Sequence, residues 1–239
     1  MNAPGSPHAS QSLWAELCLA VPGFVGHQAR AALAKRSADL PRAFFHYAED
    51  GDRTLNGPPL IRILANGHSV RVLGITADGA LLLLKHASAV ARAFDIGAKP
   101  WTLREGSLRA IPLAWPRHYR ADAFVVSLPA GTREAARTGR FDDPALLAIV
   151  GTRLRDALVR QAAFIGVDLN TASIENLTIS RSTAVKAKAG RYFAALDVDF
   201  TLASNLIGPW QIGRLQARGY GRLHAVRPQA RLLLPEIAA

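Results

Sequence analysis

Two apolar runs separated by an Asn-Gly pair constrain the fold of this chain more than any other segment. Residues 59–64 read Pro-Leu-Ile-Arg-Ile-Leu, and residues 70–75 read Val-Arg-Val-Leu-Gly-Ile. Asn66 and Gly67 lie between them, and both residue types accept the positive φ angles that a tight hairpin turn requires. The sequence therefore predicts a β-hairpin in the first half of the chain.

The segments around this hairpin favour a β-α-β-β-α-β order. In chain order the pattern predicts a strand at 13–21, a helix at 26–37, a short helix at 39–50, the hairpin, a helix at 86–94 and a strand at 108–113. Pro41 is tolerated in the first turn of the short helix, and Gly97 closes the alanine-rich one. This order is the ferredoxin-like arrangement.

The second half repeats this order less regularly. The expected elements are a strand at 124–128, a mobile basic loop at 130–140, a long helix capped by Asp143, strands at 174–185 and 192–202, and a last strand at 223–226. An apolar stripe supports the long helix, and its members are Leu147, Val150, Leu154 and Leu158.

The apolar pattern is interrupted by proline and polar residues between 115 and 122, which predicts a boundary there. We therefore expect an α+β protein with two tandem ferredoxin-like (RRM-like) domains, one at 11–118 and one at 119–239. Residues 1–10 are small and polar, and a disordered tail is expected over them.

A glycine-rich loop follows the strand at 192–202. Its glycines, Gly213, Gly219 and Gly221, have Gly-x5-Gly-x-Gly spacing. Glycine permits positive φ and lets a ligand approach backbone amides, and arginines beside such a loop favour phosphate. An ordinary turn with exposed arginines is the alternative. The side chains available for contacts are those of Arg214, Arg218, Tyr220 and Arg222.

The charge of the chain favours a nucleic-acid partner. Its 239 residues carry a formal net charge of +11 and a sequence pI of about 10.8. Hydrophobic residues make up 49% of the chain, enough for a folded core. Only five of the 29 basic residues are lysines, and arginine both matches phosphate and stacks on bases. RNA or DNA is the partner that this excess of arginine favours.

A second basic segment lies at the turn between two predicted strands of the second half. Lys186, Lys188 and Arg191 lie at its tip, and they predict an electropositive hairpin that contacts nucleic acid. A solvated turn that lysine keeps soluble is the alternative.

The cellular compartment follows from what the sequence lacks. The single cysteine, Cys18, cannot form an internal disulfide, which favours the cytoplasm. No apolar stretch reaches the roughly 20 residues that span a bilayer, so no membrane association is expected.

The chain resembles the CRISPR repeat-RNA processing endonucleases of the repeat-associated mysterious protein superfamily, and the resemblance covers nearly its whole length. Residues 59–63 and 72–75 are similar to a "PLI…LGI" hairpin of many members, and the glycine-rich loop and the high pI agree. Residues 42–46 resemble the segment, at the end of the helical region after the first strand, in which many members carry a catalytic histidine. The usual tyrosine and lysine companions are not evident, and arginines lie nearby instead, as in the type IV version.

The resemblance implies an endoribonuclease that binds CRISPR repeat hairpins and cleaves precursor RNA into mature guide RNA. The 2′-OH beside the scissile phosphate would attack, leaving a 2′,3′-cyclic phosphate, and no metal or cofactor would be needed. A histidine would transfer protons, and arginines would hold the phosphate and offset its developing charge. The candidate catalytic residues are His46, Arg42, Arg30 and Arg36. The protein would stay on the product hairpin and join other effector subunits.

Three alternatives stay open at this point. His46 lies among Phe44, Phe45 and Tyr47, so it could be the polar member of a partly buried aromatic cluster. A non-catalytic guide-RNA-binding subunit of an effector complex would share the fold and charge but keep no proton-transfer group near the glycine-rich loop. Another RNA-binding protein, with paired RNA-recognition domains, should show aromatic pairs on its central strands, which the sequence does not contain.

Overall fold

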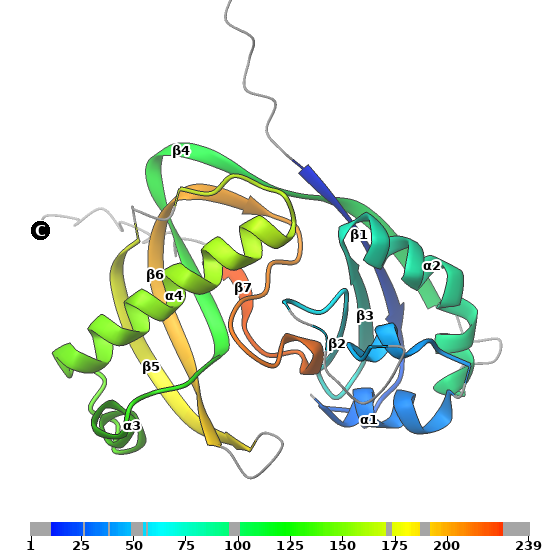
Figure 1. Cartoon of the computed structure of the whole chain (residues 1–239), viewed down its shortest axis with the longest axis horizontal. Coiled ribbons are helices and arrows are strands. Elements are labelled where there is room, and N and C mark those ends of the chain that lie inside the picture. The colour runs from blue at the N-terminus through cyan, green and yellow to red at the C-terminus, as the bar shows by residue number, and fades with distance from the viewer. Residues whose placement is uncertain are drawn as a thin grey trace, which may run out of the picture.

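The strands form one antiparallel sheet that runs through both halves of the molecule (Figure 1). The computed structural model describes residues 11–25, 27–37, 39–48, 55, 57–95, 101–170, 174–186 and 192–226. Within these ranges seven strands lie in the order β2-β3-β1-β4-β6-β5, with β7 paired to β4 beside this path. The two halves share β4, Trp101–Val126.

The first half follows the predicted β-α-β-β-α-β order. Its elements are β1 (Gln11–Leu19), α1 (His27–Arg36), β2 (Ile61–Ala65), β3 (Val70–Ile75), α2 (Thr76–Ala93) and the start of β4. The predicted hairpin is confirmed, with Ile63 opposite Val72. Asn66 holds its turn, because the side-chain oxygen accepts hydrogen bonds from the backbone N–H groups of His68 (3.1 Å) and Ser69 (2.9 Å).

Among its described residues, the second half has no α-helix that corresponds to α2. Its elements after β4 are α3 (Ala130–Arg137), α4 (Pro144–Phe164), β5 (Glu175–Lys186), β6 (Tyr192–Ile207) and β7 (Arg222–Ala225). Asp143 caps α4 as predicted, since its carboxylate accepts the backbone N–H of Leu146 (3.0 Å). Between β6 and β7 the described chain contains one short 3-10 helix, Gln216–Arg218, so the second repeat of the order is incomplete.

Three predicted segments differ from the structure. In place of a helix over the described part of 39–50 there is a 3-10 helix at Arg42–Phe45, which ends where His46 takes a left-handed φ of 64°. The loop predicted at 130–140 contains α3, which forms because two alanines, Ala135 and Ala136, are buried on its inner face. The helix α2 starts directly after β3 and includes the four consecutive leucines.

Residues 115–122, where a boundary was predicted, belong to β4. Residues 117–121 pair with β6, and residues 119–122 also pair with β7. The strand tolerates its prolines because the register with β6 shifts between Pro112 and Arg117. The division at 118–119 thus falls within a continuous strand. The tail predicted at 1–10 lies outside the described residues.

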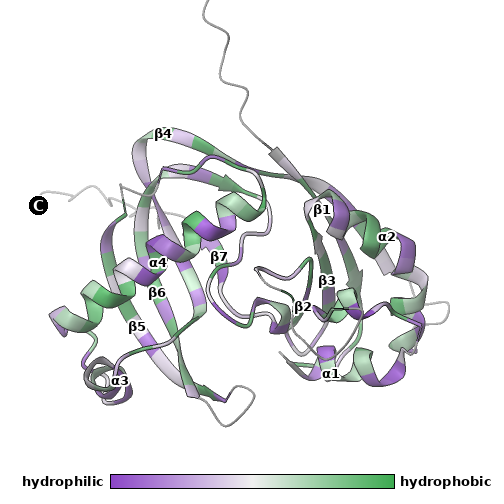
Figure 2. Ribbon diagram, viewed as in Figure 1, coloured by the Kyte–Doolittle hydropathy of each residue, from purple (hydrophilic) through white to green (hydrophobic). Residues whose placement is uncertain are grey.

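Three hydrophobic clusters fill the molecule. One packs α1 and α2 against β1, β2 and β3, and another packs α3 and α4 against β4, β5 and β6. Hydrophobic and hydrophilic residues alternate along the middle of β6 (Figure 2). The third cluster lies between the halves and includes Leu73, Ile165 and the buried Trp210. In the described chain, no helix combines the length and the apolar character that a membrane crossing requires.

A buried arginine also joins the halves. Arg62 of β2 has no solvent exposure, and its guanidinium donates to the side-chain oxygens of Gln161 in α4 (2.9 Å) and Gln211 (3.4 Å). It also donates to the carbonyl of Pro59 (3.5 Å). Burial lowers the pKa of Arg62 to about 9, so it remains a cation at neutral pH. The three oxygens that accept its hydrogen bonds within the described chain, one backbone carbonyl and two side-chain amides, are all uncharged.

We predict that Gln161→Leu lowers the free energy of unfolding by about 1.5–3 kcal/mol, because it removes the shortest hydrogen bond to a buried charge. In an Arg62→Met background the same substitution should cost less than about 1 kcal/mol, since no charge is left to satisfy. Urea unfolding of the four proteins measures this difference. Equal costs in the two backgrounds would contradict the role of Arg62.

Candidate functional site

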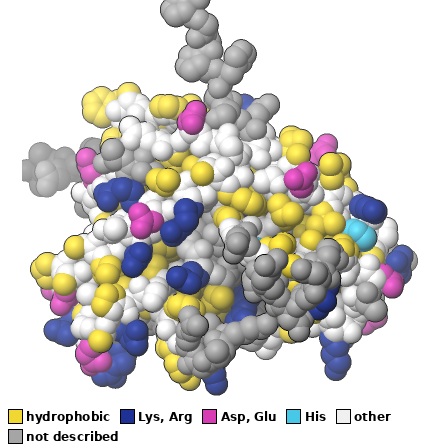
Figure 3. Space-filling view, viewed as in Figure 1, with side chains coloured by type: hydrophobic (Ala, Val, Ile, Leu, Met, Phe, Trp, Pro, Cys, Tyr) yellow, Lys and Arg dark blue, Asp and Glu magenta, His cyan; other side chains and the backbone are white. Residues whose placement is uncertain are grey.

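A cleft of about 890 Å³ lies between the two halves. The first half contributes Arg30 of α1 and residues 45–47 and 57–59, and the second half contributes the end of β4, one side of α4 and the glycine-rich loop. Among the described lining residues there is no carboxylate, and the basic ones are Arg30, His46, Arg153, Arg160, Arg214 and Arg218. In Figure 3 Lys and Arg side chains gather over α3 and α4. The cleft is therefore strongly cationic.

His46 reaches this cleft from the turn that ends the 3-10 helix. Its φ of 64° is left-handed, a conformation in which histidine is one of the enriched residue types. Its backbone N–H donates to the carbonyl of Ala43 (3.0 Å), and its carbonyl accepts the N–H of Leu55 (3.1 Å). Both hydrogen bonds fix the backbone, so the half-buried imidazole is held at the wall of the cleft.

Arg30 of α1 lies next to this histidine. Its guanidinium donates to the carbonyl of Phe45 and lies 5.9 Å from the ring centre of Phe45 and 5.8 Å from that of Tyr47. Burial lowers the pKa of His46, and the charge of Arg30 lowers it further. The neutral imidazole is thus favoured at neutral pH, which suits a group that accepts a proton.

The glycine-rich loop packs against the protein's own backbone. A side chain on Gly219, whose φ is 86°, would lie 3.0 Å from the carbonyl oxygen of Ile63 in β2, and one on Gly221 would lie 1.8 Å from that of Ile212. The N–H groups of Gly219 and Gly221 donate to carbonyls within the chain. The predicted positive φ is confirmed, but these two amides serve internal contacts, and the loop presents side chains to the cleft.

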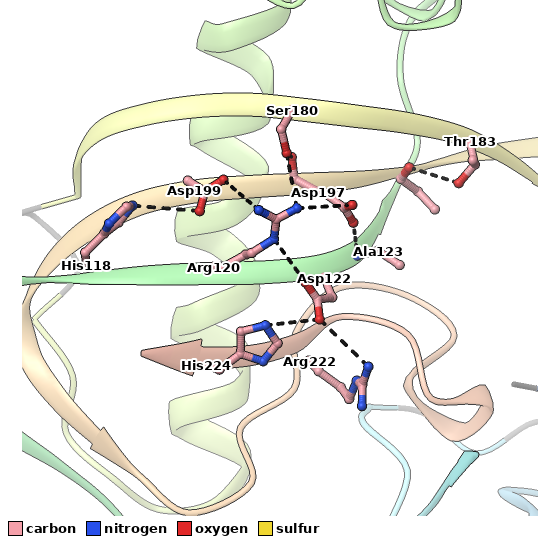
Figure 4. Close-up of polar contacts among 11 residues, drawn as sticks. His118, Arg120, Asp122, Ala123, Ser180, Thr183, Asp197, Asp199, Arg222 and His224 are labelled. Atoms are coloured by element: carbon pink, nitrogen blue, oxygen red, sulfur yellow. Dashed lines mark hydrogen bonds and ion pairs between the residues drawn. The ribbon is translucent and has the colours of Figure 1, made fainter. Parts of the chain in front are cut away.

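A β-bulge in β4 supports this loop (Figure 4). The N–H of Gly221 donates to the carbonyls of Asp122 and Ala123 in the bulge. Ala123 has a left-handed φ of 49°. Its backbone N–H donates to the carboxylate of Asp197 (2.8 Å). Arg120 connects the strands around the bulge by pairing at 3.2–3.6 Å with three carboxylates, those of Asp122, Asp197 and Asp199. Carboxylates in this half thus brace the loop from outside the cleft.

Arg222 and two histidines belong to the same network. His224 lies 3.0 Å and Arg222 lies 3.8 Å from the Asp122 carboxylate. The hydrogen bond from His224, together with these neighbouring charges, lowers the pKa of Asp122. His118 lies 3.8 Å from Asp199. Arg222 and His224 therefore contact the bulge, and neither lines the cleft.

The structure brings together five of the predicted site residues, because the cleft lining includes His46, Arg30, Gly213, Arg214 and Arg218. Arg36 does not join them, since it pairs with Asp95 at 3.2 Å. Arg42 and Tyr220 are also outside the lining, and the carbonyl of Tyr220 accepts a hydrogen bond from Gln211 (3.4 Å). Apart from Arg30, the arginines that line the cleft therefore all come from the second half.

Of the three basic residues predicted at the hairpin tip, the structure describes Lys186. Lys186 is the exposed last residue of β5. Lys188 and Arg191 lie outside the described residues.

Sequence analysis missed two arginines and one aromatic residue of the cleft. Arg153 and Arg160 of α4 and Phe193 of β6 line it. Arg153 and Arg160 are seven residues apart, which places them on one side of a helix. That spacing beside the apolar stripe was the available signal, whereas nothing local in the sequence marks Phe193.

We predict that Gly219→Val strains the loop by about 1–3 kcal/mol and weakens RNA binding. Gly139→Val is the matched control, because Gly139 has a φ of 76° and nothing within 4 Å of an added side chain. Both variants should lose stability in thermal melts, while only Gly219→Val should lose affinity in filter binding. Unchanged affinity in a folded Gly219→Val protein would remove the loop from the binding surface.

The comparisons with known proteins agree with this geometry. The family model of the type IV CRISPR-associated endonuclease Csf5 matches residues 13–228. No match was found among curated proteins. The solved structure of Csf5, a CRISPR-Cas type IV Cas6 crRNA endonuclease, has 20% identity and a TM-score of 0.68 over 90% of this chain and 100% of that one.

Two solved structures of Cas6b are similar as well. One has 14% identity and a TM-score of 0.65, covering 91% of this chain and 100% of that chain. The other, titled a CRISPR RNA processing endoribonuclease, has 15% identity and a TM-score of 0.59, covering 90% and 100%. These likenesses show a shared fold, and the family model extends over nearly all of the described residues. The chain belongs to the Csf5 family of type IV CRISPR-associated endonucleases.

Proposed function

We propose that this protein cleaves CRISPR repeat RNA in the cleft between its halves, without a metal ion, and remains bound to the product hairpin. One observation carries the proposal: His46, whose pKa is lowered by burial and by Arg30, and five arginines from both halves line one cleft that has no carboxylate among its described residues. The solved Csf5 structure is titled a crRNA endonuclease, which supports the same substrate class here.

The chemistry needs only a positioned phosphate and a proton acceptor. RNA carries its own nucleophile, the 2′-OH beside the scissile phosphate. His46 accepts the proton of that hydroxyl as the oxygen attacks phosphorus, the bond from phosphorus to the 5′-oxygen breaks, and the leaving oxygen takes up a proton from the imidazolium or from water. The products are a 2′,3′-cyclic phosphate and a 5′-hydroxyl. Arg214 and Arg218 hold the phosphate and offset the charge that develops on its oxygens.

Arg30 acts mainly on His46. Its contacts with Phe45 and Tyr47 fix it beside the histidine, and its charge helps to keep the imidazole neutral. A neutral imidazole at physiological pH is the form that a general base requires. The remaining arginines, Arg153 and Arg160, contact phosphates away from the scissile one.

The two halves are proposed to be tandem ferredoxin-like domains, divided near residue 118. The order of elements in the first half supports this, and the second half departs from it because the described chain between β6 and β7 contains a short 3-10 helix in place of an α-helix. Retention of the product hairpin would let the protein enter an effector complex together with its guide RNA.

The decisive experiment is incubation of the protein with labelled repeat RNA in EDTA. Cleavage at one position, with products that carry a cyclic phosphate and a 5′-hydroxyl, supports the proposal. A protein that binds the repeat tightly but leaves it intact, with and without added Mg²⁺, is instead a guide-RNA-binding subunit. Cleavage that requires added metal overturns the proposed mechanism.

We predict that His46→Ala slows single-turnover cleavage by about 10²- to 10⁴-fold with little change in affinity. Because burial and Arg30 place the pKa of His46 below 6.5, the wild-type rate should rise with pH only on the acid side of this value and be level at neutral pH. The variant should lose that dependence.

His68→Ala is the control for this experiment, since His68 lies exposed in the β2–β3 turn. It should keep both the rate and the pH profile. If His46→Ala cleaves normally while Arg30→Ala is slow, the arginines carry the chemistry and His46 is not the base.

We predict that Arg160→Gln lowers the salt dependence of RNA binding by about 0.7 in the slope of log K against log salt, the value for one lost phosphate contact. Arg155→Gln is the matched control, because Arg155 is an exposed arginine of the same helix that does not line the cleft. Its slope should equal that of the wild type. If Arg160→Gln also keeps the wild-type slope, Arg160 does not contact a phosphate of the bound RNA.

A further inference from the structure

One aromatic side chain of the cleft has no role in the core. Phe193, near the start of β6, is half-buried and lines the cleft. It belongs to none of the three hydrophobic clusters and does not pack on them as a partly buried member. A large apolar ring that the core does not use, in a wall otherwise rich in arginine, indicates a contact with a ligand.

Arg214 of the glycine-rich loop lies over this ring. Its guanidinium carbon is 5.2 Å from the ring centre of Phe193, within the range of a cation–π contact. The backbone N–H of Arg214 donates to the carbonyl of Val125 at 3.0 Å. The ring and the backbone hydrogen bond therefore fix the arginine at the wall of the cleft before any ligand arrives.

The charge of Arg214 is available to a ligand. No described carboxylate pairs with it, whereas Arg120 in the same half pairs with three. The comparable arginine on the opposite wall, Arg30, donates to the carbonyl of Phe45 and so supports the chain around His46. Arg214 makes no such hydrogen bond with its side chain in the described structure. It is thus suited to contact RNA.

Aromatic rings and guanidinium groups are the surfaces on which unpaired RNA bases stack. A base inside a helix is already stacked on its neighbours and cannot reach such a surface. We propose that Phe193 and Arg214 form a stacking site for one unpaired base next to the scissile phosphate, so that the substrate must carry an unpaired nucleotide there. This inference rests on the proposed cleavage function.

The stacking site gives the cleft a selectivity that phosphate contacts cannot supply. Phosphates occur at every nucleotide, so arginines alone hold any RNA of suitable shape. Stacking has no strong base preference, and it selects for an unpaired position in place of a sequence. The site therefore places the cut beside an unpaired nucleotide of the repeat.

The test combines protein and RNA changes. Phe193→Leu keeps an apolar side chain but removes the ring, and it should weaken binding of repeat RNA by about 5- to 100-fold. Phe193→Trp should bind as well as the wild type. Affinity is then measured for a series of repeat RNAs, each with one abasic nucleotide near the cleavage position. On the RNA that lacks the stacked base, Phe193→Leu and the wild type should bind with equal affinity.

Tyr192→Leu is the control, because Tyr192 is the exposed neighbouring residue and does not line the cleft. It should behave as the wild type on every RNA, and thermal melts of all variants should coincide. A Phe193→Leu effect of equal size on all abasic RNAs, or no effect at all, overturns the stacking site.

A separate measurement distinguishes failure of this inference from failure of the cleavage function. Binding of a short single-stranded RNA with 2-aminopurine is measured by fluorescence, which needs no cleavage. Quenching by the wild type and its loss in Phe193→Leu support the stacking site even if no RNA is cut. Cleavage by the wild type together with unchanged quenching in Phe193→Leu contradicts the stacking site and leaves the cleavage function intact.

Discussion

The contact between the halves depends on a buried cation that is held by neutral oxygens. Arg62 of β2 reaches across to Gln161 of α4 and to Gln211, which in turn donates to the carbonyl of Tyr220. A small displacement of the halves would lengthen these hydrogen bonds while the guanidinium is still buried, and it would therefore cost free energy. The position of the glycine-rich loop relative to β2, and hence the shape of the cleft, follows from this constraint.

Opposite charges are separated in the second half. Three aspartates gather around Arg120 and fix the bulge of β4, while arginines from α4 and the loop line the cleft. If these carboxylates lay in the cleft, they would pair with the arginines and repel phosphate. Placing them behind the loop lets them order the backbone of the site and leaves Arg214 and Arg218 without a carboxylate partner among the described residues, whereas Arg153 of α4 lies 4.0 Å from Asp156.

The sequence predicted those features that local signals determine. The Asn66–Gly67 hairpin and the Asp143 cap each depend on residues a few positions apart, and both are present. The sequence could not show that α1 presents Arg30 to the cleft and Arg36 away from it, because that depends on which side of the helix the sheet covers. Phe193 was missed for a similar reason. What distinguishes it is its contact with Arg214, a residue that is distant in sequence and lies in a different element.

The shared strand β4 has a consequence for how RNA is recognised. A strand that is hydrogen-bonded to β1 along one part and to β6 along the next cannot act as a hinge without breaking backbone pairs. The pairing of β4 with both β1 and β6 therefore restrains changes in the width of the cleft. If the repeat RNA binds in this cleft as proposed, it has to fit a width that the backbone pairs of β4 restrain.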